Sequence, residues 1–223
     1  MTSIVIPALN EATTLEEVIR RCRPFGAEIL VVDGGSTDGT RDVAQRSGVK
    51  WVLQKGKGKG SALRQSADHA AGDILVFIDA DGSHVPEDIP KLVEPIERGQ
   101  ADMVIASRLL GGSSELHGGF DEFLRFSGSS FITACINWKF GVRLSDSQNG
   151  FRAVRKQSFK ELGIKSSSTV VEQDMIMRAL SKGLRIQDIP SHEFVRQGGV
   201  SKVQVFKLWH RYVGSLIRGM LWE

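Results

Sequence analysis

Two aspartates that follow a short apolar run have the types and the spacing to hold a metal ion. Residues 73–82 contain the continuous apolar run 74–78, and Asp79 and Asp81 come directly after it. Side chains at alternate positions of an extended segment point the same way, so the two carboxylates should lie close together. Like charges at that separation repel unless a cation lies between them. A hard divalent cation, shared with the phosphate oxygens of a substrate, would satisfy both carboxylates.

The apolar run before these aspartates is typical of a strand buried on both faces, as in a parallel sheet covered by helices. In open parallel sheets the ligand binds beyond the carboxyl ends of the strands, which would place the pair at the rim of a crevice. An isolated Asp-x-Asp also recurs by chance, and the alternative is a strand end with two solvated carboxylates that mark a turn.

Length and composition favour an ordinary soluble protein with one large domain or two small ones. The chain has 223 residues, of which 41% are hydrophobic and 25% are charged, and its net charge of +3 does not indicate nucleic acid as a partner. Cys22 and Cys135 show neither metal-ligand spacing nor a disulfide framework, which favours a reducing, cytoplasmic compartment. No signal-peptide pattern precedes the first expected strand, and no uncharged apolar run approaches the ~20 residues that span a bilayer.

Short apolar segments alternate with helical ones along the first half of the chain. This rhythm predicts an α/β fold with a mostly parallel, doubly wound sheet flanked by helices. Right-handed crossovers would bring the loops after the strands, and with them Glu11, Asp33 and the Asp79–Asp81 pair, to one edge. The expected strands are residues 3–7, 28–33, 50–54, 73–79 and 103–107.

The second half is less regular, with a long helix over 121–140, a polar loop at 145–149 and a terminal helix over 203–222. Between them we expect a strand at 150–154, a helix at 171–182 and a strand at 184–189. No linker separates the halves. We therefore predict one domain, residues 1–202, made of a first half (1–107) and a second half (108–202), followed by an amphipathic helix at 203–223.

Two features at the edge of the sheet where the strands are expected to end could contact a nucleotide. The loop 55–60 alternates lysine and glycine before a helix, so its backbone could approach an anion, and Lys59 and Arg64 would add positive charge. It has neither P-loop nor Rossmann spacing, and a solvated loop explains it equally well. Asp33 could accept hydrogen bonds from a base or ribose, or could simply form the turn that follows it.

Together these segments resemble the family 2 glycosyltransferases of the GT-A fold, and the resemblance covers nearly the whole chain. Residues 146–152 resemble a segment of the branch that glycosylates polyprenyl phosphates, whose best-known members are the dolichyl-phosphate mannose and glucose synthases. Residues 172–174 resemble that branch's acidic pair, and Arg196 with Ser201 and Lys202 resembles its late basic segment. The first-half segments that carry the resemblance are residues 7–11, 32–40, 58–64 and 79–82.

The resemblance implies a nucleotide-diphosphate sugar donor, GDP-mannose or UDP-glucose. Asp79 and Asp81 would bind Mg²⁺ or Mn²⁺ on the diphosphate, and the metal would offset the charge of the departing nucleoside diphosphate. The residues expected to hold the base and ribose are Pro7, Leu9, Glu11 and Asp33. Further residues expected to contact substrate are Lys59, Arg64, Ala80, Gln148, Arg152, Arg196, Ser201 and Lys202.

On the acceptor side, Arg108 and Arg125 match by order and rough spacing the arginines that the mannose synthases use for the acceptor phosphate. One position departs from the pattern, because those synthases often carry glutamine two residues after the second metal aspartate and this chain has Ser83. A third metal ligand at that position is therefore in doubt. The Gly-Lys-Gly and Asp-x-Gln segments favour the glucose-type members, which leaves the sugar open.

A phosphate acceptor determines the expected mechanism. A phosphate monoester is largely dianionic at neutral pH and needs no strong base, unlike a sugar hydroxyl. We therefore expect in-line attack of a phosphate oxygen on the anomeric carbon, with inversion. Asp146 would position donor or acceptor, or would merely cap a turn. The basic residues expected to neutralise and aim the acceptor are Arg108, Arg125, Arg196 and Lys202.

Two other functions fit the same sequence. A glycosyltransferase of this fold that acts on a saccharide hydroxyl would need a positioned base, for which Asp146 and Asp174 are the candidates. A nucleotide-sugar-binding protein without catalytic activity is the other.

The terminal helix bears on location. One of its faces is an apolar stripe that includes Trp209, and another carries basic residues that include Arg211 and Arg218. This pattern is typical of a helix on a membrane surface and equally of one that packs on the protein core. A lipid-linked acceptor favours the membrane surface as a partner. The expected location is the cytoplasmic face of a membrane, with peripheral attachment, and a membrane protein could supply an anchor.

Overall fold

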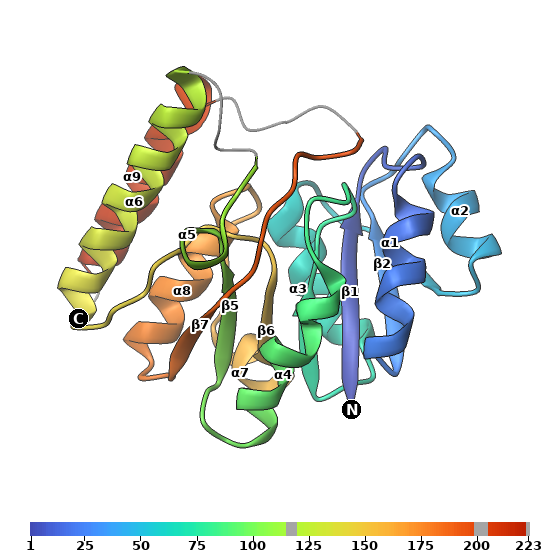
Figure 1. Ribbon diagram of the computed structural model, residues 1–223, viewed down its shortest axis with the longest axis horizontal. Coiled ribbons are helices and arrows are strands. Elements are labelled where there is room, and N and C mark those ends of the chain that lie inside the picture. The colour runs from blue at the N-terminus through green and yellow to red at the C-terminus, as the bar shows by residue number, and fades with distance from the viewer. Residues whose placement is uncertain (115–119, 199–204, 222–223) are drawn as a thin grey trace.

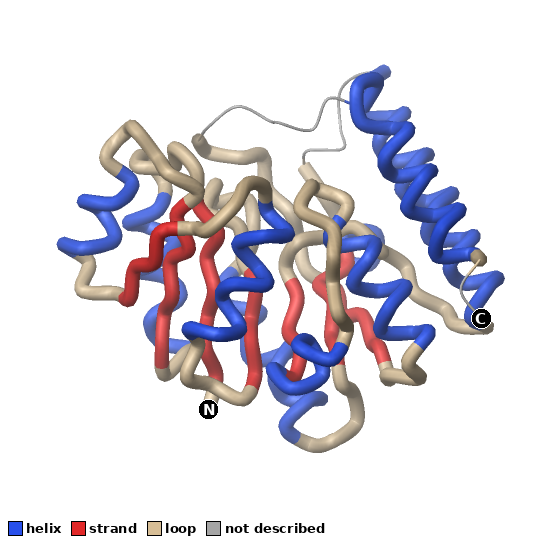
Figure 2. Tube along the Cα trace, turned by 180° about the vertical axis from the view of Figure 1, so that it is seen from behind, coloured by secondary structure: helices blue, strands red, loops and turns tan. Residues whose placement is uncertain are grey.

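Seven strands form one sheet in the order β3-β2-β1-β4-β6-β5-β7, and helices cover both of its faces (Figures 1 and 2). The computed structural model describes residues 1–114, 120–198 and 205–221. The strands are β1 (Thr2–Ala8), β2 (Glu28–Asp33), β3 (Lys50–Leu53), β4 (Ile74–Phe77), β5 (Met103–Ser107), β6 (Arg152–Arg155) and β7 (Ile186–Pro190). The α-helices are α1 (Leu15–Cys22), α2 (Thr40–Arg46), α3 (Lys59–His69), α4 (Ile89–Glu97), α5 (Arg108–Gly111), α6 (Phe120–Phe140), α7 (Lys156–Glu161), α8 (Val171–Ser181) and α9 (Val205–Met220), with 3-10 turns at Arg23–Phe25 and Pro86–Asp88.

The predicted α/β fold with a mostly parallel sheet is confirmed. Strand β1 pairs in parallel with both β2 and β4, so the three strands end at the same edge. Only β6 runs antiparallel among the described strands, and it lies between β4 and β5. Because an antiparallel strand begins where its neighbours end, Arg152 lies opposite Phe77 and the segment just before it reaches that edge.

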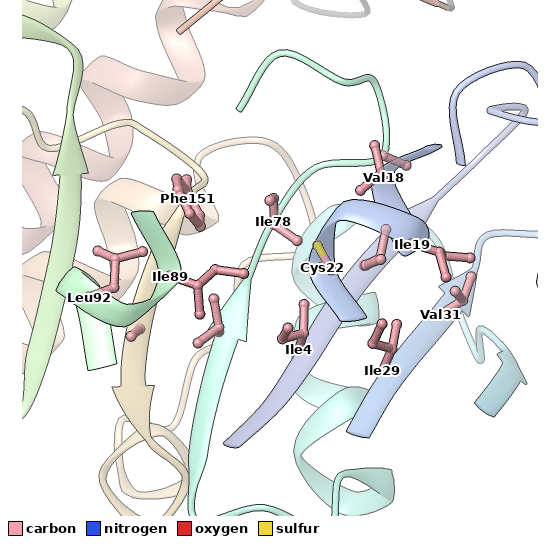
Figure 3. Close-up of a cluster of buried hydrophobic side chains, with 14 of the residues drawn as sticks. Ile4, Val18, Ile19, Cys22, Ile29, Val31, Ile78, Ile89, Leu92 and Phe151 are labelled. Atoms are coloured by element: carbon pink, nitrogen blue, oxygen red, sulfur yellow. The ribbon is translucent and has the colours of Figure 1, made fainter. Parts of the chain in front are cut away.

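Two hydrophobic cores lie on opposite faces of the sheet, as expected for strands buried on both sides. Along β1 the side chain of Ile4 enters the core under α1, α2 and α4, and that of Val5 enters the core under α3, α7 and α8. Figure 3 shows part of the first core, where Ile4, Ile19 and Cys22 gather between the sheet and its helices. Burial raises the pKa of the Cys22 thiol to about 12, so it stays protonated, and neither cysteine forms a disulfide.

The terminal helix α9 packs against α6 and α8 at the edge of the molecule, where Figures 1 and 2 show α6 and α9 side by side. Leu216 is buried in the second core, and Gly219 allows close approach because an added Cβ would lie 2.3 Å from Cε of Met177. No helix in the described ranges is long and apolar enough to cross a membrane. The predicted domain boundary after residue 202 lies outside the described residues.

The glycines of the lysine/glycine loop make room for protein backbone. A Cβ at Gly58 or Gly60 would lie 2.1 Å from the carbonyl oxygen of Ser167 or Ser166, respectively. The Gly60 amide also donates a hydrogen bond to the Ser167 carbonyl, at 3.2 Å. These glycines therefore let the start of α3 contact the chain at residues 166–167.

This contact predicts that replacing Gly60 by alanine destabilises the protein, although alanine is ordinarily the more stable residue inside a helix. Gly60→Ala should lower the free energy of unfolding by about 1–3 kcal/mol, because the added methyl group overlaps a backbone carbonyl. Gly128→Ala in α6, where nothing lies within 4 Å of the new Cβ, should instead raise it by about 0.5–1 kcal/mol. Urea unfolding of both variants measures the difference, and equal stabilisation by the two alanines would contradict this account of the loop.

Candidate active site

Lys59, at the start of α3, links two acidic residues from different elements. Its Nζ lies 2.6 Å from Oδ1 of Asp79, beyond β4, and 2.8 Å from Oε1 of Glu172, in the first turn of α8. Burial alone would raise the pKa of Asp79, but the charge and hydrogen bond of Lys59, together with the nearby His84, outweigh it and hold that pKa well below its usual range. Burial opposes the charge of Lys59 too, and its two carboxylate partners nevertheless raise the pKa of its ammonium group. Lys59 and Asp79 therefore form an ion pair at neutral pH.

His84 and Gly150 complete the surroundings of Asp79. The buried His84 ring stacks on Phe151, with ring centroids 5.3 Å apart, and its Nε2 lies 3.5 Å from Oδ2 of Asp79. That nitrogen makes no well-formed hydrogen bond within the described chain. A Cβ at Gly150 would lie 2.6 Å from Nζ of Lys59 and 2.8 Å from Oδ2 of Asp79, so a glycine leaves room for the ion pair.

Asp81 has a separate cationic partner. Its Oδ2 lies 2.8 Å from an Nη atom of Arg196, and its Oδ1 accepts hydrogen bonds from the amide and hydroxyl of Ser83 at 3.0 and 2.7 Å. The amide of Gln197 donates to the carbonyl of Asp81, which fastens this late loop to the site. Ser83, the residue that departs from the mannose-synthase pattern, therefore orients the Asp81 carboxylate.

The strand before the aspartates is shorter than expected. β4 ends at Phe77, and Asp81 lies in a turn, so the expectation that both carboxylates project from one extended segment is wrong. A turn gives each carboxylate its own surroundings, which is why Asp79 meets Lys59 and Asp81 meets Arg196.

The donor chemistry of the two aspartates fits a divalent cation. Both offer carboxylate oxygens, the ligands that Mg²⁺ prefers, and in this structure those oxygens balance the charges of Lys59 and Arg196. Within the described ranges, no group of three His, Cys, Asp or Glu side chains forms a complete metal cage. The remaining ligands would be substrate phosphate oxygens and water, which is usual for Mg²⁺.

Another ion pair joins the end of β5 to the polar loop before β6. Arg108 donates from Nε and Nη2 to the Asp146 carboxylate at 2.6 and 3.1 Å, and the same carboxylate accepts the amides of Gln148 and Asn149. Burial alone would raise the pKa of Asp146, but the charge and hydrogen bonds of Arg108 outweigh it and lower that pKa below its ordinary value. Asp146 is thus a weak base that caps a turn and orients Arg108.

At the ends of β1 and β2, the residues expected to hold a nucleotide lie next to one another. Pro7 and Glu11 are half-buried, Leu9 is exposed, and the amide of Gly34 donates to the carbonyl of Ala8. This arrangement leaves the Leu9 side chain accessible at the edge.

Asp33 is buried and serves its own turn. Its Oδ1 accepts the amides of Gly35 and Ser36 and the Ser36 hydroxyl, and its Oδ2 accepts Nε1 of Trp51 at 3.2 Å. In this structure Asp33 therefore forms the turn that follows β2, which is the alternative to a contact with the nucleotide.

Several other predicted residues contact protein. Arg64 donates to the carbonyl of Ser166. Arg152 is only 1% exposed and donates to the carbonyls of Asn149 and Glu172. In this structure it therefore supports Glu172, whereas the sequence predicts that it contacts substrate. Ala80 is buried. The match to family motifs predicts contact with substrate at these positions, but a motif does not reveal burial.

Two further points concern residues expected on the acceptor side. Gln148 is half-buried, and its Nε2 has no hydrogen-bond partner in the described part of the chain. The side chain of Arg125, and all of Ser201 and Lys202, lie outside the described residues. Sequence reasoning did not assign a site role to His84, Gly150 or Glu172, although Glu172 belongs to the matched acidic pair.

The parallel sheet, the acidic turn after β4 and the basic residues around it define a nucleotide-diphospho-sugar transferase fold, the GT-A fold. The chain belongs to glycosyl transferase family 2, whose sequence model matches residues 3–163.

Relatives of known sequence agree with this assignment. Glycosyltransferase AglJ of Haloferax volcanii is 32% identical over 198 residues, which cover 88% of this chain and 64% of AglJ. The dolichol-phosphate mannosyltransferase of Pyrococcus furiosus is 30% identical over 230 residues, covering 99% of this chain and 64% of that protein. The chain spans less than two thirds of these relatives, and 48% of the Haloferax volcanii hexosyltransferase Agl6.

Solved structures share the fold over the whole chain. Glucosyl-3-phosphoglycerate synthase of Mycobacterium tuberculosis, in complex with Mn²⁺, UDP-glucose and phosphoglyceric acid, has a TM-score of 0.77 and 25% identity, covering 99% of this chain and 79% of that one. The same enzyme was also solved with Mg²⁺ and UDP. The predictions of family, fold and glycosyltransferase class are confirmed, and these neighbours hold the two cations that the sequence predicts.

The lowered pKa of Asp146 predicts a pH-dependent contribution to stability. At pH 7, Asp146→Asn should lower the free energy of unfolding by about 3 kcal/mol, because it removes the nearer of two carboxylates that pair with Arg108, the other being Glu193 at 3.7 Å. A depressed carboxyl pKa stabilises the folded state above the unfolded value of ~3.9, and this contribution is lost as pH falls through the folded value. The difference from wild type should therefore shrink below about pH 4.

Urea unfolding of both proteins between neutral and acidic pH measures this difference. Asp68→Asn removes one exposed negative charge and serves as the control. A difference for Asp146→Asn that is independent of pH would contradict the ion-pair account.

Proposed function

We propose that this chain is an inverting, metal-dependent glycosyltransferase that moves a hexose from a nucleotide-diphosphate sugar to a polyprenyl phosphate. The observation that carries this proposal is the acidic turn after β4, where Asp79 and Asp81 each face a basic residue from a distant segment. Family membership supports the transfer of a sugar, and the Pyrococcus furiosus relative supports a lipid phosphate as the acceptor.

On the donor side, Asp79 and Asp81 would hold Mg²⁺ or Mn²⁺, which when bound offsets the charge of the departing diphosphate. Lys59 and Arg196 border the same carboxylates and would supply fixed positive charge to the diphosphate oxygens. Pro7, Leu9, Glu11 and Asp33 would line the nucleoside at the ends of β1 and β2. The UDP-glucose complex of the Mycobacterium tuberculosis neighbour supports a nucleotide sugar as the donor.

On the acceptor side, the pairing of the candidate bases with arginines favours a phosphate. A hydroxyl acceptor requires a positioned base. Asp146 has a lowered pKa and is paired with Arg108, and Asp174 is paired with Arg178 at 2.8 Å. An acceptor phosphate is already anionic and attacks without such a base. Arg108, oriented by Asp146, would then aim the acceptor toward the sugar, together with Arg125 and Lys202.

We also propose peripheral association with the cytoplasmic face of a membrane, with residues 1–202 as the catalytic unit. Helix α9 exposes Trp209 and Ile217, which are each 56% exposed, and Leu221 just beyond its end is 77% exposed, although Leu216 is buried. Large apolar side chains next to basic ones are typical of helices at a membrane interface. A membrane protein could add an anchor.

The metal role of the acidic turn leads to the first functional test. Asp81→Asn should lower the initial rate of nucleoside-diphosphate release roughly 100-fold or more, since one preorganised charge at the reacting diphosphate is lost. Mn²⁺ should raise the melting temperature of wild type and not that of the variant. Asp42→Asn, an exposed aspartate in α2, is the control for charge. Near wild-type rates with saturating Mn²⁺ would remove Asp81 from the mechanism.

The acceptor class leads to the second test. With a suitable donor sugar, product should form with a short-chain polyprenyl phosphate and not with the corresponding polyprenol or a free saccharide. Asp146→Asn should only slow this transfer, because the phosphate needs no base, and should stop it if a hydroxyl is the acceptor. Chromatography of radiolabelled product measures both. Faster transfer to a saccharide or to phosphoglyceric acid would reject the lipid acceptor, and bound donor without turnover would indicate a binding protein.

A further inference from the structure

His84 is a buried side chain to which the proposed transfer reaction gives no role. It lies between the acidic turn and the 3-10 turn at Pro86–Asp88, and only 4% of it is exposed. Its Nε2 makes no well-formed hydrogen bond with the described residues, although Oδ2 of Asp79 lies 3.5 Å away. Buried polar atoms are nearly always paired, because an unpaired one has lost its hydrogen bonds to water. A ring nitrogen just short of a carboxylate therefore requires an explanation.

The direction of the His84 ring is fixed by Phe151. The two rings stack with their centroids 5.3 Å apart and their planes 27° apart. Phe151 is fully buried in the first hydrophobic core, where Figure 3 shows its side chain among the others. Close packing leaves a core side chain little freedom, so the stack holds the His84 ring in place beside Asp79.

The two oxygens of the Asp79 carboxylate have different neighbours. Oδ1 lies 2.6 Å from Nζ of Lys59, which is an ammonium group. Oδ2 faces the His84 ring, and a Cβ at Gly150 would lie 2.8 Å from the same oxygen. Residues 150 and 151 therefore act on one carboxylate, because the glycine leaves space for it and the phenylalanine holds the ring that faces it.

A divalent cation at Asp79 would compete with Lys59, since two cations at one carboxylate repel each other. Lys59 has a second partner in Glu172, whose Oε1 lies 2.8 Å from Nζ, so the ammonium group would keep a counter-charge. The Asp79 carboxylate would lose the contact that orients it in this structure. His84 offers a replacement without added charge, because a neutral imidazole donates one N–H.

We propose that His84 is a positioning residue of the metal site. Its Nε2–H donates to Oδ2 of Asp79 and holds that carboxylate in the orientation that binds Mg²⁺ or Mn²⁺. Carboxylates that bind metals ordinarily accept such a hydrogen bond from a further residue. His84 is not assigned as a ligand, because its nitrogen faces the carboxylate that would bind the ion. This role rests on the metal function of Asp79 in the proposed function.

Two substitutions separate the hydrogen bond of His84 from its packing. His84→Gln keeps a neutral N–H donor at the end of the side chain, whereas His84→Met fills a similar volume against Phe151 without a donor. Circular dichroism and the melting temperature check that both variants fold. His210→Met removes an exposed histidine of α9 and is the matched control for the loss of an imidazole.

Binding of Mn²⁺ to the whole chain is the measurement that tests this role. Mn²⁺ is titrated alone and then together with UDP or GDP, and the electron paramagnetic resonance signal of free Mn²⁺ gives the dissociation constant. Nucleotide without protein is the blank, because a nucleoside diphosphate binds Mn²⁺ by itself. The measurement needs neither an acceptor nor turnover, so its result does not depend on the transfer reaction.

His84→Met should raise the dissociation constant for Mn²⁺ about 10- to 100-fold, whereas His84→Gln should stay within roughly threefold of wild type and His210→Met should match it. Equal weakening in the glutamine and methionine variants of His84, equal weakening in the control, or no weakening in His84→Met would overturn the positioning role and leave the metal site in place. Wild type that binds no Mn²⁺ even with nucleotide would overturn the metal function of the acidic turn, and this role with it.

Discussion

Compensation of negative charge at one edge of the sheet is the constraint on which the site depends. Three of the aspartates at this edge are each paired with a basic residue from a distant part of the chain. The pairs are Asp79 with Lys59, Asp81 with Arg196, and Asp146 with Arg108. Because the partners come from α3, from the late loop and from the end of β5, the charge balance also fixes these segments around the edge. A ligand that brings phosphates meets positive charge that is already in position.

The antiparallel strand β6 makes this convergence possible. It is inserted between β4 and β5 and begins at the edge where they end, so the loop with Asp146 reaches the same rim as Asp79. Arg152 at its start is buried and supports the backbone of Glu172, which in turn contacts Lys59. The antiparallel direction of β6 thus brings the polar loop, α8 and the acidic turn together.

The segment around Ser166 and Ser167 connects two surfaces of different character. Its carbonyl groups contact α3 beside Lys59, and Ser166 and Ser167 also line a cleft against α9 whose walls include Arg178, Arg211 and Arg218. The glycines at 58 and 60 leave space for this contact. One short segment thus contacts both the helix that carries Lys59 and a cleft lined largely by basic residues.

The sequence by itself determined the strands, the α/β class and the acidic rim, because apolar runs and the acids after them are local patterns. Asp79 and Asp33 could be placed at strand ends in this way. Only the tertiary structure decided that Lys59 bridges Asp79 and Glu172, that His84 lies beside Asp79, and that Arg152 is buried. These contacts join residues far apart in the chain, and their formation depends on strand order and on the direction of β6, which no local pattern records.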